Sequence, residues 1–206
     1  MQNLVDIKSL NKDEIIEIIK LAEDFKQDKA LSACFGKHIA LLFYENSTRT
    51  RVSFEMAANK LGIHIYNFDA GTSSFSKGES MKDTIENLYA IGINAVVIRH
   101  SEAGIIDKIV TEINCPMKFA NAGDGNHSHP TQALLDFYTM QKHIGSVEGK
   151  KIAINAMEAP MLIIRKVDEL SAHTILSFLN LILHATNSCA TTRRPTAISV
   201  RVILLS

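Results

Sequence analysis

The sequence has few cysteines, no tryptophan and no excess of charge of either sign. Its 206 residues include three cysteines, Cys34, Cys115 and Cys189, which lie far apart and form no CxxC pair. A small, odd number of cysteines without that spacing argues against both a disulfide framework and a thiolate zinc site. We therefore expect a reducing compartment, of which the cytoplasm is the simplest.

Long apolar runs and charge asymmetry are also lacking. No stretch approaches the ~20 apolar residues that span a bilayer, and the N-terminal residues lack the basic-then-apolar order of a signal peptide. Lysine and arginine together number 22, as do aspartate and glutamate. This balance predicts neither a nucleic-acid nor a membrane partner, because both require a broad basic surface. Any anion site must then be built from specific local contacts.

Apolar runs of strand length alternate with segments of helical periodicity up to about residue 145. The expected strands are residues 38–43, 64–68, 95–98 and 117–120, and the expected helices begin near Asn11, Thr50, Ser80, Gly104 and Pro130. Such alternation predicts an α/β fold with a mainly parallel sheet flanked by helices. Ligands in such sheets bind outside the carboxyl ends of the strands, so we expect a site in the loops after Phe43, Phe68, Ile98 and Ala120.

A polar, glycine-flanked break, "GSVEGKK" at residues 145–151, divides the chain into predicted domains at residues 1–145 and 146–206. Beyond it we expect a strand at residues 151–154, an apolar helix at 171–185 and a strand at 197–205.

The first loop places Ser47, Thr48, Arg49 and Thr50 where a helix begins. Hydroxyls, a guanidinium and unpaired helix N–H groups are suited to holding a tetrahedral anion such as phosphate. The same residues also fit a well-capped helix with solvated arginines, because serine and threonine are favoured N-caps. These four positions alone leave both interpretations open.

The fourth loop, "NAGDGNHSHPTQALLD" at residues 121–136, is the most unusual. Its glycines indicate close backbone approach by a ligand. His127, His129 and Asp124 are types that bind metals, but no further histidine or cysteine stands at a diagnostic spacing, so we predict no metal. His129 precedes a helix that starts with proline and is placed to donate a hydrogen bond to a developing oxyanion. Taken singly, the second loop with Lys77 and the third with Arg99 are typical of ordinary surface.

Four segments together closely resemble the catalytic chains of the aspartate carbamoyltransferase family. They are "STRTRVSFE" at residues 47–55, "SSFSKGE" at 73–79, "VIRH" at 97–100 and the residues 121–136 quoted above. The resemblance covers about residues 1–154, and the order and spacing of the segments agree with it. It implies a carbamoyl phosphate-binding domain followed by an aspartate-binding domain.

The resemblance further implies transfer of the carbamoyl group of carbamoyl phosphate to L-aspartate in pyrimidine biosynthesis, without a metal or organic cofactor. It assigns the phosphate to Ser47, Thr48, Arg49 and Thr50, and the carbamoyl group to Arg99, His129 and Gln132. By the same resemblance Ser73 and Lys77 serve the site of a neighbouring subunit, so a cytoplasmic homotrimer with shared sites is expected. Whether a regulatory chain binds is left open.

After Ile154 the sequence departs from that family, and the residues expected to hold aspartate are not recognisable. We therefore expect an incomplete or aberrant second domain in residues 146–206. The alternative hypothesis is a carbamoyl phosphate-binding domain without turnover, in a truncated or frameshifted chain. A carbamoyltransferase that acts on another amine is a third possibility.

Overall fold

The computed structural model describes residues 3–27, 34–69 and 79–147. The strands are β1 (His38–Phe43), β2 (His64–Asp69), β3 (Ala95–His100) and β4 (Lys118–Asp124). The helices are α1 (Lys12–Lys26), α2 (Thr48–Lys60), α3 (Met81–Ala90), α4 (Ile105–Glu112) and α5 (Pro130–Ile144), with a short 3-10 turn at Ile7–Ser9. The predicted alternation of strand and helix is confirmed over these residues.

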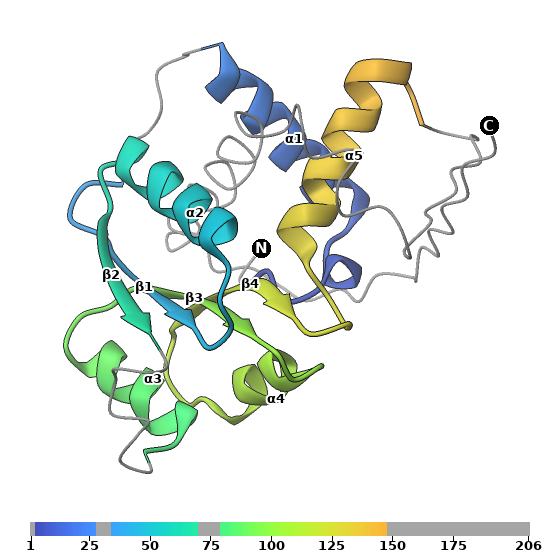
Figure 1. The fold of residues 1–206 in the computed structure, drawn as a ribbon. Coiled ribbons are helices and arrows are strands. Elements are labelled where there is room, and N and C mark those ends of the chain that lie inside the picture. Colours follow the sequence, from blue (N-terminus) through green and yellow to red (C-terminus); the bar gives the residue numbers. More distant parts are fainter. Residues whose placement is uncertain (1–2, 28–33, 70–78, 148–206) are drawn as a thin grey trace.

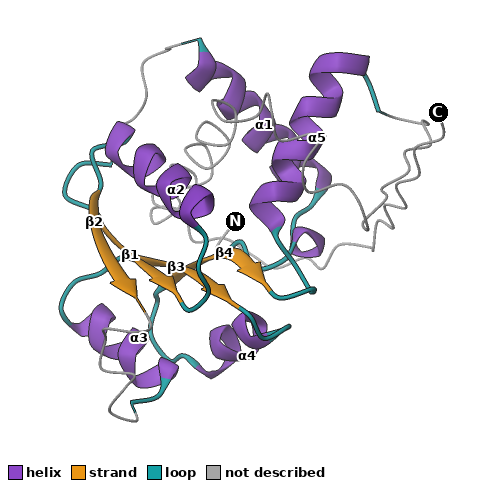
Figure 2. Ribbon diagram, viewed as in Figure 1, coloured by secondary structure: helices purple, strands orange, loops and turns teal. Residues whose placement is uncertain are grey.

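The four strands form one parallel sheet in the order β2-β1-β3-β4 (Figure 2). Phe43, the last residue of β1, pairs with Asp69 on one side and with Arg99 on the other. His100 of β3 pairs with Asp124, the last residue of β4. All four strands therefore end at the same edge of the sheet, where ligands bind in folds of this kind.

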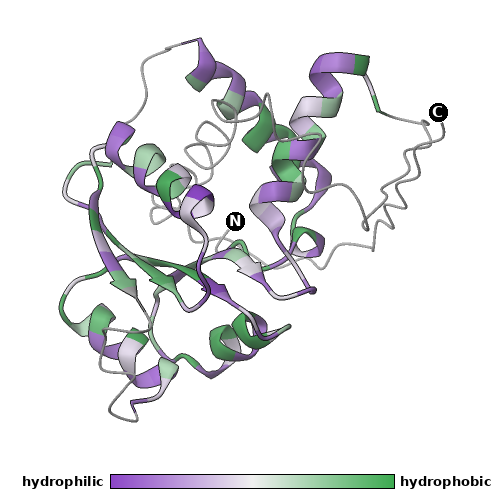
Figure 3. Ribbon diagram, viewed as in Figure 1, coloured by the Kyte–Doolittle hydropathy of each residue, from purple (hydrophilic) through white to green (hydrophobic). Residues whose placement is uncertain are grey.

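Helices cover both faces of the sheet, and each face has its own apolar core. α1, α2 and α5 lie over one face, where Ile18, Phe54 and Leu134 are buried against β1 and β3 (Figures 1 and 3). α3 and α4 lie over the other face, where Ile85 and Ile106 are buried. A parallel sheet buried on both faces explains the continuous apolar runs of its strands.

The predicted helix starts agree with the observed caps. The Asn11 side chain accepts from the Glu14 N–H, and the Glu14 carboxylate accepts from the Asn11 N–H, both at 2.9 Å, which makes a reciprocal capping box. Ser80 caps α3 by accepting from the Asp83 N–H at 3.1 Å. Pro130 occupies the first turn of α5. The one shifted start is that of α2, which begins at Thr48 rather than Thr50.

Two predicted strand ends were wrong. β3 continues through Arg99 and His100, and β4 continues through Asp124, where loops were expected after Ile98 and Ala120. Polar residues are tolerated in these strand ends because they have partners inside the protein. The Arg99 guanidinium donates from Nη1 to the Ala122 carbonyl at 2.9 Å, and the buried Asn121 amide donates to the Val5 carbonyl at 2.9 Å.

The N-terminal segment protects the outer edge of β4. The Leu4 N–H donates to the Phe119 carbonyl at 2.9 Å, and the Leu4 carbonyl accepts from the Asn121 N–H at 2.8 Å. Leu4 is fully buried and forms a parallel bridge with Ala120. This pairing satisfies backbone groups that an edge strand would otherwise leave exposed, and it was not foreseen from the sequence.

Within the described ranges, no helix combines the length and the apolar character needed to cross a membrane. The predicted strands at 151–154 and 197–205 and the helix at 171–185 lie outside the described residues. Since residues 148–206 are not described, the division of the chain at residue 145 stays a prediction.

Candidate functional site

Two helices begin close to the carboxyl edge of the sheet, on the same face. α2 starts five residues after β1 ends, and α5 starts six residues after β4 ends (Thr48 − Phe43 = 5; Pro130 − Asp124 = 6). Both lie on the face that α1 also covers (Figure 1). The N-terminus of a helix carries unpaired N–H groups and a partial positive charge. This corner of the fold therefore favours an anion.

Arg99 lies in β3 on the face that these two helices cover. Side chains alternate along a strand, and Val97, two residues earlier, belongs to the core beneath α1, α2 and α5. The Arg99 Nη1 donates to the Ala122 carbonyl at 2.9 Å, and Nη2 lies 3.4 Å from Glu45 Oε2. In the described part of the chain the buried Arg99 Nε has no hydrogen-bond partner. A guanidinium with an unsatisfied buried donor is suited to binding an anionic or carbonyl ligand.

Gly123 brings Arg99 and His129 together. A Cβ atom placed on Gly123 would lie 2.5 Å from Arg99 Nη1 and 3.2 Å from His129 Cδ2. The two side chains thus converge on the Cα atom of Gly123, which has a φ of +115° that disfavours other residues. The glycine-rich sequence was expected to admit a ligand close to the backbone. That approach stays a prediction, and the structure shows in addition that Gly123 makes room for two side chains.

His129 is held as a neutral hydrogen-bond donor. It is the N-cap of α5, and its Nδ1 accepts from the Gln132 backbone N–H at 3.4 Å. A backbone N–H can only donate, so Nδ1 is unprotonated and the ring proton sits on Nε2. Burial, reinforced by the nearby Arg99 charge, lowers the pKa of His129 to about 4. At neutral pH the imidazole can therefore donate from Nε2 to a carbonyl oxygen without carrying a charge.

The first turn of α2 is not capped by its own serine. The Ser47 hydroxyl donates to Thr50 Oγ1 at 2.9 Å, and its side chain makes no capping hydrogen bond. Thr48 and Arg49 are exposed on this turn, whereas Arg51 lies over the Phe43 ring, 5.1 Å from its centroid. The serine cap of an ordinary helix start is therefore absent, whereas the exposed Arg49 agrees with either interpretation, so the phosphate site at this turn stays a prediction.

Gln132 lies exposed on the first turn of α5, one helical turn before Asp136. Its side-chain Nε2 donates to Asp136 Oδ1 at 2.9 Å, and this hydrogen bond fixes the orientation of the Gln132 amide group. Burial raises the pKa of Asp136. The other two predicted site residues, Ser73 and Lys77, lie outside the described residues.

Two residues of this corner, Glu45 and Asn121, were not singled out from the sequence, and Asp124 was considered there only as a metal ligand. Glu45 pairs with Arg99, as described above. Asn121 and Asp124 are fully buried polar residues at the end of β4. The sequence did contain a signal for them, because an amide and a carboxylate stand between small residues at the end of an apolar strand. Such groups are buried only when they are hydrogen-bonded, so they indicate an internal polar network.

The described residues contain no group of three histidine, cysteine, aspartate or glutamate side chains that could hold a metal ion. His127 Nδ1 instead lies 2.9 Å from Asp124 Oδ2. His129 Nδ1 contacts the first turn of α5, at the Gln132 N–H.

Comparison with known proteins gives consistent matches over this part of the chain. The family model of the aspartate/ornithine carbamoyltransferase carbamoyl-P binding domain matches residues 2–142. The aspartate carbamoyltransferase catalytic subunit of Aliarcobacter butzleri is 52% identical over 155 residues, which are 75% of this chain and 52% of that protein. The corresponding subunit of Campylobacter jejuni serotype O:6 is 48% identical over the same shares of both chains.

Solved structures agree with these matches. Aspartate transcarbamoylase from Trypanosoma cruzi, in complex with carbamoyl aspartate and phosphate, has a TM-score of 0.65 at 32% identity and covers 73% of this chain and 49% of its own. The catalytic subunit of the M. jannaschii enzyme has a TM-score of 0.64 at 38% identity, covering 74% and 50%. The chain thus spans about half the length of the curated relatives it matches.

Proposed function

We propose, because the chain belongs to the aspartate/ornithine carbamoyltransferase family, that the corner described above binds carbamoyl phosphate and supports transfer of its carbamoyl group to L-aspartate. The observation that carries this proposal is the convergence of Arg99 and His129 over Gly123, beside the uncapped start of α2. One site then offers a cradle for a phosphate group and two donors for the adjoining carbonyl oxygen.

The phosphate half of the site is assigned to the start of α2. The backbone N–H groups of its first turn, the Arg49 guanidinium and the hydroxyls of Ser47, Thr48 and Thr50 supply donors to a tetrahedral anion. Helix polarity adds a favourable field at this end. In the proposed homotrimer, Lys77 of the neighbouring subunit adds a positive charge and its Ser73 adds a hydroxyl donor.

The carbamoyl half is assigned to Arg99, His129 and Gln132. When the amine nitrogen of L-aspartate attacks the carbamoyl carbon, negative charge develops on the carbonyl oxygen, and the Arg99 guanidinium and the His129 Nε2–H stabilise it. The bond from that carbon to the bridging oxygen then breaks. Phosphate leaves with a proton from the amine, and N-carbamoyl-L-aspartate remains. No covalent intermediate with the protein is needed, because the site acts by holding the reactants in line.

His129 must be neutral for this role, and its lowered pKa supports that. An imidazolium beside Arg99 would add like charge, whereas a neutral ring still donates one hydrogen bond. We therefore expect that protonation of His129 does not change the rate of transfer above about pH 5, one unit above its pKa of about 4.

The experiment is a pair of measurements on the purified chain. Calorimetry with phosphonoacetamide, in which a methylene group replaces the bridging oxygen of carbamoyl phosphate, tests binding. Release of phosphate from carbamoyl phosphate that depends on L-aspartate tests transfer. We expect both. Binding without aspartate-dependent release would favour the alternative of a binding domain without turnover, and failure of both would refute the assignment of the site.

A further inference from the structure

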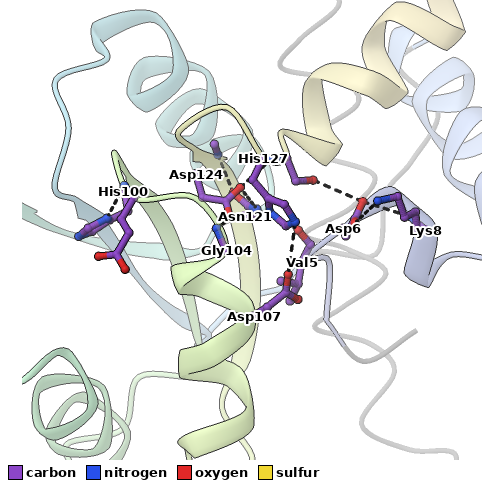
Figure 4. Close-up of polar contacts among 12 residues, drawn as sticks. Val5, Asp6, Lys8, His100, Gly104, Asp107, Asn121, Asp124 and His127 are labelled. Atoms are coloured by element: carbon purple, nitrogen blue, oxygen red, sulfur yellow. Dashed lines mark hydrogen bonds and ion pairs between the residues drawn. The ribbon is translucent and has the colours of Figure 1, made fainter. Parts of the chain in front are cut away.

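The Asp124 carboxylate is fully buried and accepts hydrogen bonds from three segments of the chain. Its Oδ1 accepts from the Asn121 side-chain amide at 3.0 Å and from the Ser128 N–H at 2.9 Å. Its Oδ2 accepts from the Gly104 N–H at 3.0 Å and contacts His127 Nδ1 at 2.9 Å (Figure 4). A buried carboxylate with four donors fixes their relative positions, since losing any one of them exposes a costly unpaired group.

These contacts enclose the turn between Gly123 and His129. Asn121, which donates to Asp124, also accepts from the Gly123 N–H at 2.7 Å through Oδ1. The Asp124 N–H donates to the Ser128 carbonyl at 3.1 Å, so the backbone closes on itself just before His129. The Asp124 carboxylate thus lies at the base of the turn that leads to His129, although Asp124 itself is not in the anion site.

His127 is the fourth hydrogen-bond partner of Asp124. Its Nε2 lies 3.9 Å from Asp107 Oδ2 on α4 (Figure 4). The Asp6 carboxylate of the N-terminal segment, which pairs with Lys8 at 3.6 Å and accepts from the Ser128 hydroxyl at 3.4 Å, adds a smaller charge effect on His127. The hydrogen bond to Asp124 is the largest cause that raises the pKa of His127. His127 thus ties the end of β4 to α4 from the solvent side.

We propose that Asp124, paired with His127, is the positioning residue that holds the His129 imidazole against Arg99, an inference that rests on the proposed carbamoyl phosphate site. The backbone N–H groups of Gly104 and Ser128 hold the carboxylate in place, and His127 contacts it from the solvent side. Loss of the carboxylate charge rotates the turn and withdraws Nε2 of His129 from the carbamoyl oxygen. The start of α2, which binds the phosphate half, is unaffected.

The test compares two ligands and one spectroscopic signal in four variants of the whole chain. Asp124→Asn keeps the size of the side chain but replaces an acceptor oxygen with a donor, so at least one of its four donors loses its partner. His127→Ala removes this hydrogen bond, whereas His127→Asn keeps a donor near the position of Nδ1. His143→Ala is the matched control, because His143 is an exposed histidine in the last turn of α5.

We expect Asp124→Asn to weaken phosphonoacetamide binding about 3- to 12-fold, the worth of the one hydrogen bond from the neutral His129 ring. Its affinity for inorganic phosphate alone should stay within about twofold of the unchanged chain, because the α2 half is intact. His127→Ala should show a smaller loss of the same selective kind, and His127→Asn should recover most of it. His143→Ala should match the unchanged chain.

The ring nitrogen resonances of His129 in isotope-labelled protein give a readout that needs no ligand. In the unchanged chain they should report a neutral ring protonated on Nε2, and they should shift in Asp124→Asn and His127→Ala but not in His143→Ala. If the unchanged chain binds neither ligand while these shifts occur, the proposed function fails and the positioning role stands. If phosphonoacetamide binds and neither affinity nor resonances change, the positioning role is overturned. If Asp124→Asn does not fold, the two His127 variants decide the question by the same criteria.

Discussion

Replacing Gly123 with alanine is the sharpest perturbation of the site. The added methyl group would lie 2.5 Å from Arg99 Nη1, well inside van der Waals contact, and 3.2 Å from His129 Cδ2. Because Nη1 is the far end of a flexible side chain, the guanidinium moves and the backbone stays. We therefore expect a folded protein in which Arg99 has left the Ala122 carbonyl and the carbamoyl half of the site is open.

The expected effect of Gly123→Ala has two parts, a backbone cost and the loss of a side-chain contact, and a second variant separates them. Gly92 has a φ of +105°, close to that of Gly123, and nothing lies within 4 Å of a Cβ built on it. Gly92→Ala therefore measures the backbone cost alone, about 1–2 kcal/mol. Gly123→Ala adds the loss of a hydrogen bond from a charged donor, about 1.5–3 kcal/mol. If the displaced guanidinium is equally lost to the ligand, affinity for phosphonoacetamide falls about 10- to 150-fold.

Calorimetry for affinity and urea unfolding for stability measure both parts in the same proteins. We expect Gly92→Ala to lose stability but bind phosphonoacetamide like the unchanged chain, and Gly123→Ala to lose both. Equal affinity in the two alanine variants would refute the placement of Arg99 and His129 around Gly123.

Three further predictions concern separate contacts. Arg49→Ala should weaken binding of inorganic phosphate about 10- to 100-fold, the worth of a charged hydrogen bond, with an unchanged unfolding midpoint because Arg49 is exposed; unchanged affinity would remove the start of α2 from the site. The pKa of His129 is about 4 in the folded chain, below its unfolded value of about 6.5. Between these two pH values the unfolded chain binds the extra proton, so the free energy of unfolding should fall by up to about 3 kcal/mol as the pH drops from 6.5 to 4. An NMR titration of His129 with a midpoint near the unfolded value would contradict this. Glu23 accepts from the Tyr138 hydroxyl and pairs with Lys142 at 2.7 Å. Glu23→Ala should lower the free energy of unfolding by about 1–2 kcal/mol, because it leaves the hydroxyl of the buried Tyr138 unpaired. Glu23→Gln should lower it less, and urea unfolding measures both variants.

The alternation of strands and helices was predictable because its signals are local. Asn11 with Glu14, Ser80 with Asp83, and Pro130 each mark a helix start through contacts within four residues. The parallel sheet and the edge that carries the site follow from that alternation by general rules of topology.

The strand ends and the internal contacts of the site could not be read the same way. Judged by polarity alone, Arg99 and Asn121 should end their strands. Both continue the sheet because their partners, Ala122 and Val5, come from other segments. The role of Gly123 depends likewise on a long-range contact with Arg99, 24 positions away (123 − 99 = 24). Local patterns indicate which residues are unusual, whereas their partners depend on the tertiary fold.

A crystal structure of the protein with phosphonoacetamide bound would test the central claim most directly. We predict the phosphonate at the first turn of α2 and the amide oxygen between the Arg99 guanidinium and Nε2 of His129. A phosphonate bound elsewhere on the protein, or an amide oxygen that contacts neither side chain, would contradict it.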